Sequence, residues 1–351
     1  MIDVWMQEEL VAQFVRFRRL FRSHTLSDIQ RQYPHRGFGL PLRSTAYSFA
    51  RRGPARGPAR GAPRGAPRHY GNSSPTIAEY IPTTGYNIEI EKDGADVLQD
   101  NGVPSKDIEA IFWSHWHWDD IVNPDRFPKS TALIVGQGFK KAMLPGAPAN
   151  PRSPILESDY TGRELKEIEF GFFQIGPFPA HDFFGHGSFY LPDSPGHAIG
   201  HLCGLARTTT DTFVLLGGGV CHHAGIFRPS KHLPVPASIS PHPLSNMESH
   251  FCPGHAWEEL QKSRGRAATD PLLEMTFDHD ITLATDTKRK LQELDCNNNV
   301  LVINAHGASV RDHFDRFLKS LNDWKAKGLG KKLRWDFSRE LSPYWKAKGL
   351  A

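Results

Sequence analysis

Two histidines separated by a single residue, His115 and His117, are followed at once by two carboxylates, Asp119 and Asp120. Imidazole nitrogens and carboxylate oxygens are the ligands that Zn²⁺ takes in catalytic sites, which leave one position open for water. The apolar residues 110–113 directly before them have the pattern of a buried strand, so these side chains are expected where a strand ends and a loop begins. The motif therefore predicts a metal centre.

Two further histidines stand in the same kind of place. His197 follows a Ser-Pro-Gly turn after the strand-like residues 187–191. His306 follows residues 300–304, a run rich in β-branched side chains. Both are candidates for the remaining metal ligands.

With these residues in this order, the chain resembles the metallo-β-lactamase superfamily and especially its lactonase-like branch. That branch has the signature His-x-His-x-Asp-His, then a distant His, a bridging Asp and a last His, and the match covers roughly residues 79 to 306. The resemblance implies an α+β fold, a four-layer αββα sandwich whose two stacked sheets carry a zinc pair at one edge. By motif position, His115, His117 and His197 would hold the first metal, and Asp119 and His306 would belong to the second.

The chain departs from this pattern at two positions, both at the second metal. Asp120 stands where the signature has its closing His, and Gly219 stands where the bridging Asp is expected. Asp120 still offers an oxygen ligand, whereas Gly219 has no side chain. Three neutral imidazoles and a water are enough for one Zn²⁺. The sequence therefore favours one zinc ion over two.

The function expected from these residues is zinc-dependent hydrolysis of a small ester, lactone or thioester by metal-bound hydroxide. Asp119 or Asp120 would orient or deprotonate the water. His222, three residues beyond Gly219, occupies the position where lactonase-like relatives place a Tyr, and it could support the carbonyl oxygen. Other roles stay open, because Asp119 and Asp120 could cap a helix and His222 and His306 could be structural.

Two other functional classes remain. A catalytically impaired protein of this fold would explain Asp120 and Gly219. A nucleic-acid processing enzyme would explain the basic N-terminal segment, but the rest of the chain carries a net charge of −5. The Arg-rich repeat over 52–68 has no interleaved aromatic residues, so it gives only nonspecific phosphate attraction. We therefore expect a small-molecule substrate and no nucleic-acid partner, and the sequence gives no indication of the oligomeric state.

Residues 1–78 differ from the remaining sequence. They contain 13 Arg, no Lys and 4 acidic residues, a net charge of +9 within a chain of +4. Residues 52–68 repeat Arg-Gly-Pro-Ala and then Arg-Gly-Ala-Pro, a composition that cannot bury a core. We expect a largely disordered segment over 1–78 and a metallo-β-lactamase-like domain over 79–351. By the resemblance to the lactonase-like branch, the repeat stands where relatives have a core strand, so the first sheet is expected to be incomplete.

The remaining features concern location and elements. No window approaches the roughly 20 apolar residues of a membrane span. The acidic start lacks the order of a secretory signal, and the four scattered cysteines fit a reducing compartment, so a cytoplasmic location is expected. Local patterns predict strands over 110–113, 131–135, 170–175, 187–191, 212–216 and 300–304, and helices over 95–102, 258–264, 287–294 and 310–318.

Overall fold

The structure is a computed structural model of the chain, which describes residues 12–15, 42–45, 48–50, 73–84, 87–89, 92–237, 239, 253–275, 278–307, 310, 313 and 319–347. The strands are β1 (Ala12–Val15), β2 (Leu42–Thr45), β3 (Ser48–Ala50), β4 (Asn87–Glu89), β5 (Ala110–Phe112), β6 (Ala132–Val135), β7 (Leu165–Glu167), β8 (Gln174–Ile175), β9 (Phe178–Asp182), β10 (Phe189–Pro192), β11 (Gly204–Arg207), β12 (Phe213–Leu216) and β13 (Val300–Ile303). The α-helices are α2 (Pro75–Tyr80), α3 (Gly94–Asp100), α4 (Phe139–Met143), α5 (Glu157–Tyr160), α6 (Pro253–Ser263), α7 (Ile281–Asp295), α9 (Leu329–Arg334) and α10 (Ser342–Ala347), and the 3-10 helices are η2 (Ile81–Thr84), η3 (Ser105–Asp107), η4 (Pro124–Arg126), η5 (Gly218–Val220), η6 (Ala224–Ile226) and η7 (Asp336–Leu341).

Two sheets form the centre of the molecule. Among the described residues, the first sheet has the order β2-β1-β5-β6-β7 and the second has the order β13-β12-β11-β10-β9-β8. The neighbours β5, β6 and β7 are parallel, and β1 joins β5 in the antiparallel sense. Strands β1 and β2 come from the N-terminal segment, so part of that segment belongs to the first sheet. The predicted disorder of the repeat over 52–68 lies outside the described residues, and the boundary at residue 78 and the incomplete first sheet remain predictions.

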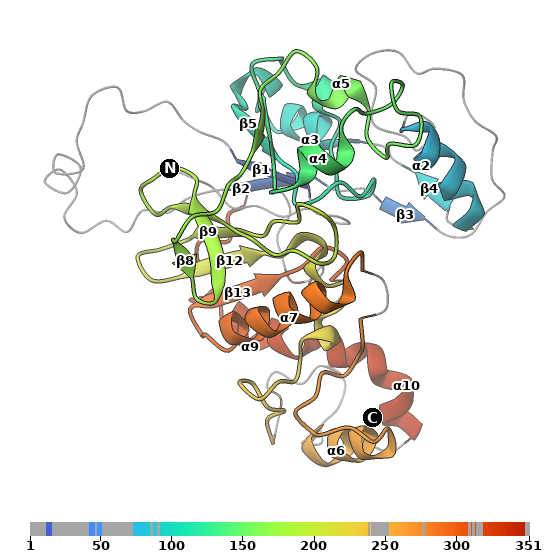
Figure 1. Cartoon of the computed structure of the whole chain (residues 1–351). Helices are drawn as coiled ribbons and strands as arrows, with labels where there is room; N and C mark the ends of the chain where they lie inside the picture. The colour runs from blue at the N-terminus through green and yellow to red at the C-terminus, as the bar shows by residue number, and fades with distance from the viewer. Residues whose placement is uncertain are drawn as a thin grey trace, which may run out of the picture.

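Side-chain alternation along the strands produces the layers. In β13, Leu301 and Ile303 join the core between the two sheets, while Val300 and Val302 pack on the other face with Leu291 of α7. Strand β5 alternates in the same way, with its odd-numbered member Ile111 packed with residues of α3 and α4. Since successive strand residues point to opposite faces, each sheet carries one face toward the other sheet and one toward helices. Figure 1 shows α3 and α4 beside the first sheet and α7 beside the second, so the predicted αββα sandwich is confirmed.

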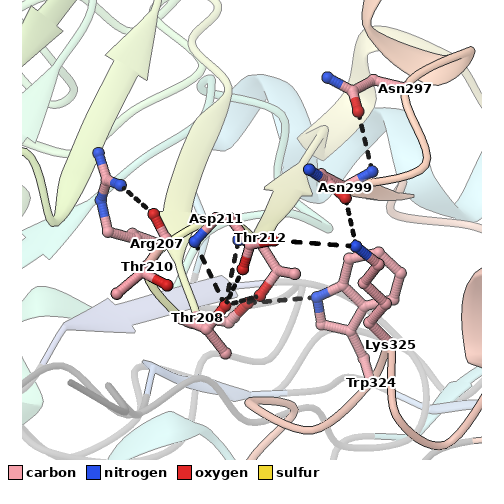
Figure 2. Close-up of polar contacts among 10 residues, drawn as sticks. Arg207, Thr208, Thr210, Asp211, Thr212, Asn297, Asn299, Trp324 and Lys325 are labelled. Carbon is pink, nitrogen blue, oxygen red and sulfur yellow. Dashed lines mark hydrogen bonds and ion pairs between the residues drawn. The ribbon is translucent and has the colours of Figure 1, made fainter. Parts of the chain in front are cut away.

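The segment after β13 is attached to the turn between β11 and β12. Trp324 donates its indole N–H to the Thr208 hydroxyl over 3.2 Å, and Thr208 also contacts the Thr212 hydroxyl over 2.8 Å (Figure 2). Next to Trp324, the Lys325 ammonium donates to the Asn299 side chain, just before β13 begins. These contacts fix the N-terminal ends of β12 and β13, whereas Gly219 and His306 follow the C-terminal ends of the same strands.

Most predicted elements are present. The strands near 110–113, 131–135, 187–191, 212–216 and 300–304 are confirmed, as are the helices near 95–102, 258–264 and 287–294. Of the strand predicted over 170–175 only β8 forms, and β7, β9 and β11 were not predicted. The predicted helix over 310–318 lies almost entirely outside the described residues. No helix in the described part of the chain has the length and apolar character needed to cross a bilayer.

Candidate metal centre

The candidate ligands lie at one edge of the two sheets, on loops that follow strands. His115 and His117 follow β5, His197 follows β10, and His306 follows β13. Backbone hydrogen bonds hold these loops together: the Leu202 N–H donates to the Ser114 carbonyl over 2.7 Å, which joins the loop after β10 to the loop after β5. The strand ends therefore bring residues far apart in sequence into one site.

Three imidazoles, His115, His117 and His197, form what we call the imidazole cluster. Their ring centroids lie 4.5 to 4.8 Å apart, and one nitrogen from each lies within 4.8 Å of the others. His117 Nδ1 and His197 Nε2 are 3.1 Å apart. Two ligands of a tetrahedral ion with bonds of about 2.1 Å lie about 3.4 Å apart, so this spacing matches two nitrogens that share one metal.

Hydrogen bonds on the outer side of the cluster orient two of the rings. His197 Nδ1 donates to the Asp278 carboxylate over 3.0 Å, which leaves its Nε2 as a lone pair that points into the cluster. His115 Nδ1 lies 3.1 Å from the Ser114 hydroxyl, and its buried Nε2 makes no hydrogen bond within the described part of the chain, although Asp120 Oδ2 lies 3.3 Å away. A buried imidazole nitrogen left without a partner is costly, and a metal ion would satisfy it.

Burial keeps two of these imidazoles, His115 and His117, neutral. Burial and the neighbouring His197 lower the pKa of His117 to about 3, and burial followed by the nearby histidines lowers the pKa of His115 well below its usual value. Since a metal binds the unprotonated imidazole, the cluster is ready for a cation at neutral pH. The donor set of the cluster fits Zn²⁺.

Asp119, Asp120 and His306 form a second group, which we call the carboxylate cluster, with ligand atoms that also lie within 4.8 Å of one another. Burial, then the charge of Asp120, raises the pKa of Asp119 to about 6. Burial alone would lower the pKa of His306, but the hydrogen bond and charge of Asp120 outweigh it and raise that pKa above its usual value. His306 is also held at a φ of 51°, a conformation that non-glycine residues seldom adopt.

His222 lies between the two clusters. Its ring centroid is 4.9 Å from that of His197 and 4.7 Å from that of His306. It lines a cavity of about 170 Å³ beside the imidazole cluster, together with His197, Gly219, Cys221, Ile226, Glu274, Met275 and Asp278. Burial followed by the His306 charge lowers the pKa of His222 to about 4, so the ring is neutral and carries a single N–H.

The glycines after β12 are required by close contacts. A Cβ at Gly218, whose φ is +52°, would lie 2.7 Å from the Ser114 side chain. A Cβ at Gly219 would lie 2.6 Å from His197 Nε2 and 2.8 Å from His115 Cε1. Both distances are below those that real side chains show, so the position of the expected bridging Asp is closed to a side chain while the imidazole cluster is in place.

Two residues at the site were not predicted as functional. Asp278 lies 81 positions from His197 and precedes a helix, so no strand-end pattern marks it. His201 was predicted to be a surface, packing or supporting group, and it is fully buried, with its Nδ1 2.8 Å from the Ser194 hydroxyl and its ring centroid 5.1 Å from that of His115. The metal-binding and catalytic roles of the six predicted ligands and of His222 remain predictions.

Replacing Asp278 by alanine should weaken zinc binding by about 10- to 100-fold, because the His197 ring loses the partner that fixes its orientation and tautomer. Asp278→Asn keeps an oxygen acceptor for the His197 ring, so its zinc affinity should decrease less than that of Asp278→Ala. The matched control is Asp286→Ala, which removes an α7 carboxylate paired with Lys290 away from the site. The dissociation constant is measured by competition with a zinc chelator, and equal affinities for Asp278→Ala and the control would show that Asp278 does not orient His197.

Comparison with known proteins identifies relatives of the chain. No family model matches it. The chain is 40% identical over 279 residues to "Gamma-lactamase FDB1" of Fusarium pseudograminearum (strain CS3096), covering 76% of this chain and 66% of that protein. It is 44% identical over 250 residues to "Metallo-hydrolase mfmC" of Annulohypoxylon moriforme, covering 69% of this chain and 64% of that protein. The chain thus spans slightly less than two thirds of each of these two relatives.

A shorter relative is covered more fully. The chain is 44% identical over 211 residues to "Gamma-lactamase MBL2" of Gibberella moniliformis (strain M3125 / FGSC 7600), which is 57% of this chain and 88% of that protein. Among solved structures, an N-acyl homoserine lactone hydrolase with N-hexanoyl-L-homoserine at its metal centre is 15% identical with a TM-score of 0.44, covering 67% of this chain and 71% of that one.

The relatives, the order of the strand-end ligands and the two stacked sheets together identify the family. The chain belongs to the metallo-β-lactamase superfamily, a family of metal-dependent hydrolases. Its histidines and aspartates form a candidate metal-binding site of the kind found in zinc hydrolases of this fold.

Proposed function

We propose that the protein is a zinc-dependent hydrolase that opens the ring of a small lactam or lactone. The observation that carries this proposal is the convergence of three imidazoles, His115, His117 and His197, beside a cavity of about 170 Å³. Two of the relatives are named γ-lactamases, which adds cyclic amides to the esters, lactones and thioesters that the sequence favours.

The imidazole cluster would hold the ion. When bound there, Zn²⁺ polarises a carbonyl group and lowers the pKa of a coordinated water toward 7. One ion in this cluster is sufficient for the reaction. The net reaction adds water across the acyl bond of the ring: the water oxygen stays on the carbonyl carbon, the bond from that carbon to the ring nitrogen or oxygen breaks, and the leaving atom takes a proton.

The chain's own residues would move the proton and bind the substrate. Asp119, with a pKa of about 6, can accept a proton from water near neutral pH and return it to the leaving atom. The neutral His222 can donate an N–H to the carbonyl oxygen, on which negative charge develops during the reaction. Ile226 and Met275 give the cavity an apolar wall against which the hydrocarbon part of a ring can pack.

The test is metal quantification on the purified chain, followed by turnover of a γ-lactam, a γ-lactone and a linear ester of similar size. At least one zinc per chain and ring opening that a chelator abolishes and added zinc restores are expected. A chain that binds no metal would overturn the proposal.

Gly219 favours a second candidate, a catalytically impaired member of the family, because it removes the side chain at the bridging position. That reading predicts zinc in the imidazole cluster and no turnover of any of the three substrates. Metal content and turnover measured on the same sample therefore separate the two candidates.

A further inference from the structure

Asp120 lies where the imidazole cluster meets the carboxylate cluster. Its Oδ2 is 3.3 Å from His115 Nε2, in the first cluster, and 3.5 Å from His306 Nε2, in the second. One oxygen atom thus contacts a candidate ligand of each ion.

The distances from Asp120 Oδ2 to these two nitrogens match those between two ligand atoms bound to the same metal ion. Two ligand atoms on a tetrahedral ion with bonds of about 2.1 Å lie about 3.4 Å apart, so Asp120 Oδ2 can share one cation with His115 and another with His306. A carboxylate oxygen has lone pairs enough for two cations.

The surroundings of Asp120 favour a cation as its partner. The side chain is 1% exposed, and its other oxygen, Oδ1, has no hydrogen-bond partner among the described residues. The facing His115 Nε2 is buried and also without a hydrogen-bond partner. A buried carboxylate is costly unless it is paired or coordinates a metal, and a cation between these groups would satisfy both.

Position 219, where the family has its bridging Asp, cannot supply a carboxylate that bridges the two ions. The resemblance to the lactonase-like branch places the bridging Asp at position 219, but a Cβ there would lie 2.6 Å from His197 Nε2. His197 cannot turn away freely, because Asp278 holds its Nδ1 over 3.0 Å. A bridging carboxylate must therefore reach the two ions from another direction.

We propose that Asp120 is the bridging ligand of a two-cation centre, so that the two departures from the family pattern compensate each other. The side chain missing at Gly219 is replaced in function by the carboxylate at Asp120, which occupies the position of the closing His of the signature. The proposal rests on the metal site of the proposed function. It replaces the expectation of one zinc ion by two, because the structure places Asp120 between the two clusters. The sequence alone does not show this position.

The test uses the full chain, stripped of metal and titrated with Mn²⁺. Binding is followed by calorimetry, and electron paramagnetic resonance shows whether two bound ions are magnetically coupled through a shared ligand. The wild-type chain should bind two Mn²⁺ and give an exchange-coupled spectrum. Asp120→Asn should keep the first ion, lose the coupled spectrum, and weaken the second ion by more than the roughly 10- to 100-fold that an outer hydrogen-bond partner is worth.

A second variant keeps the test decisive should Asp120→Asn fold poorly. Asp120→His restores the family's residue, offers a nitrogen to the second ion and cannot bridge, so it should bind two ions without coupling. The matched control is Asp125→Asn, whose carboxylate pairs with Lys129 on the same loop. A coupled spectrum that survives in either Asp120 variant, or a wild-type chain that takes one ion only, would overturn the bridge. Absence of any ion from the wild-type chain would overturn the metal site itself, and with it the proposed function.

Discussion

Replacing His117 by alanine is expected to abolish zinc binding in the imidazole cluster and to reduce ring-opening hydrolysis by about 10³-fold or more. His117 Nδ1 faces His197 Nε2 over 3.1 Å, so its removal leaves two imidazoles for an ion that needs at least three protein ligands in a catalytic site. Stabilisation of developing charge by the metal is worth several kcal/mol, and each 1.36 kcal/mol corresponds to a tenfold change in rate. The measurements are zinc content per chain and kcat/KM.

The control for this variant is His181→Ala. His181 is a partly buried histidine on β9 that belongs to neither cluster, so its loss should leave zinc content and turnover unchanged. Full zinc content in His117→Ala would show that the ion is not held by the imidazole cluster. Unchanged turnover with zinc lost would show that the chemistry does not depend on the metal.

The positions of His115 and His306 at the edge of a sheet could be predicted from the sequence because each follows a strong local signal. An apolar run precedes His115, and another precedes His306, and polar residues directly after such runs fall at the edge of a sheet. The choice of His197 among the other histidines needed the family's order of ligands, since a histidine after a Pro-Gly turn is uninformative by itself.

The contacts that complete the site could not be predicted, because they are set by packing between distant segments. Asp278 reaches His197 because the segment before α7 is hydrogen-bonded to the loop after β10, with the His279 N–H donating to the His197 carbonyl over 3.1 Å. The strand β11 was missed for a related reason: Gly204–Arg207 carries no run of β-branched residues, and its pairing with β10 and β12 determines its conformation. The position of Asp120 between two clusters is likewise a property of the folded chain.

The variant Gly219→Asp restores the family's residue, yet it is expected to lower zinc affinity and turnover rather than raise them. The new Cβ would lie 2.6 Å from His197 Nε2 and 2.8 Å from His115 Cε1, so both rings must move from the positions in which their nitrogens converge. Moving His197 also strains its hydrogen bond to Asp278. Loss of that orientation alone is worth about 10- to 100-fold in metal affinity, so the expected decrease is at least of this size.

Two further variants separate the effect of the Cβ from that of the carboxylate. Gly219→Ala adds only the clashing atom and should also lose zinc affinity, whereas Gly171→Ala, at a glycine with open space around its Cβ position, should have no effect. If Gly219→Asp combined with Asp120→His instead binds two ions and raises turnover strongly from a near-zero background, the natural chain is an impaired member of its family. A decrease in both Gly219 variants, with Asp120 intact, means that a Cβ at this position disturbs the imidazole cluster and that the site requires a glycine there.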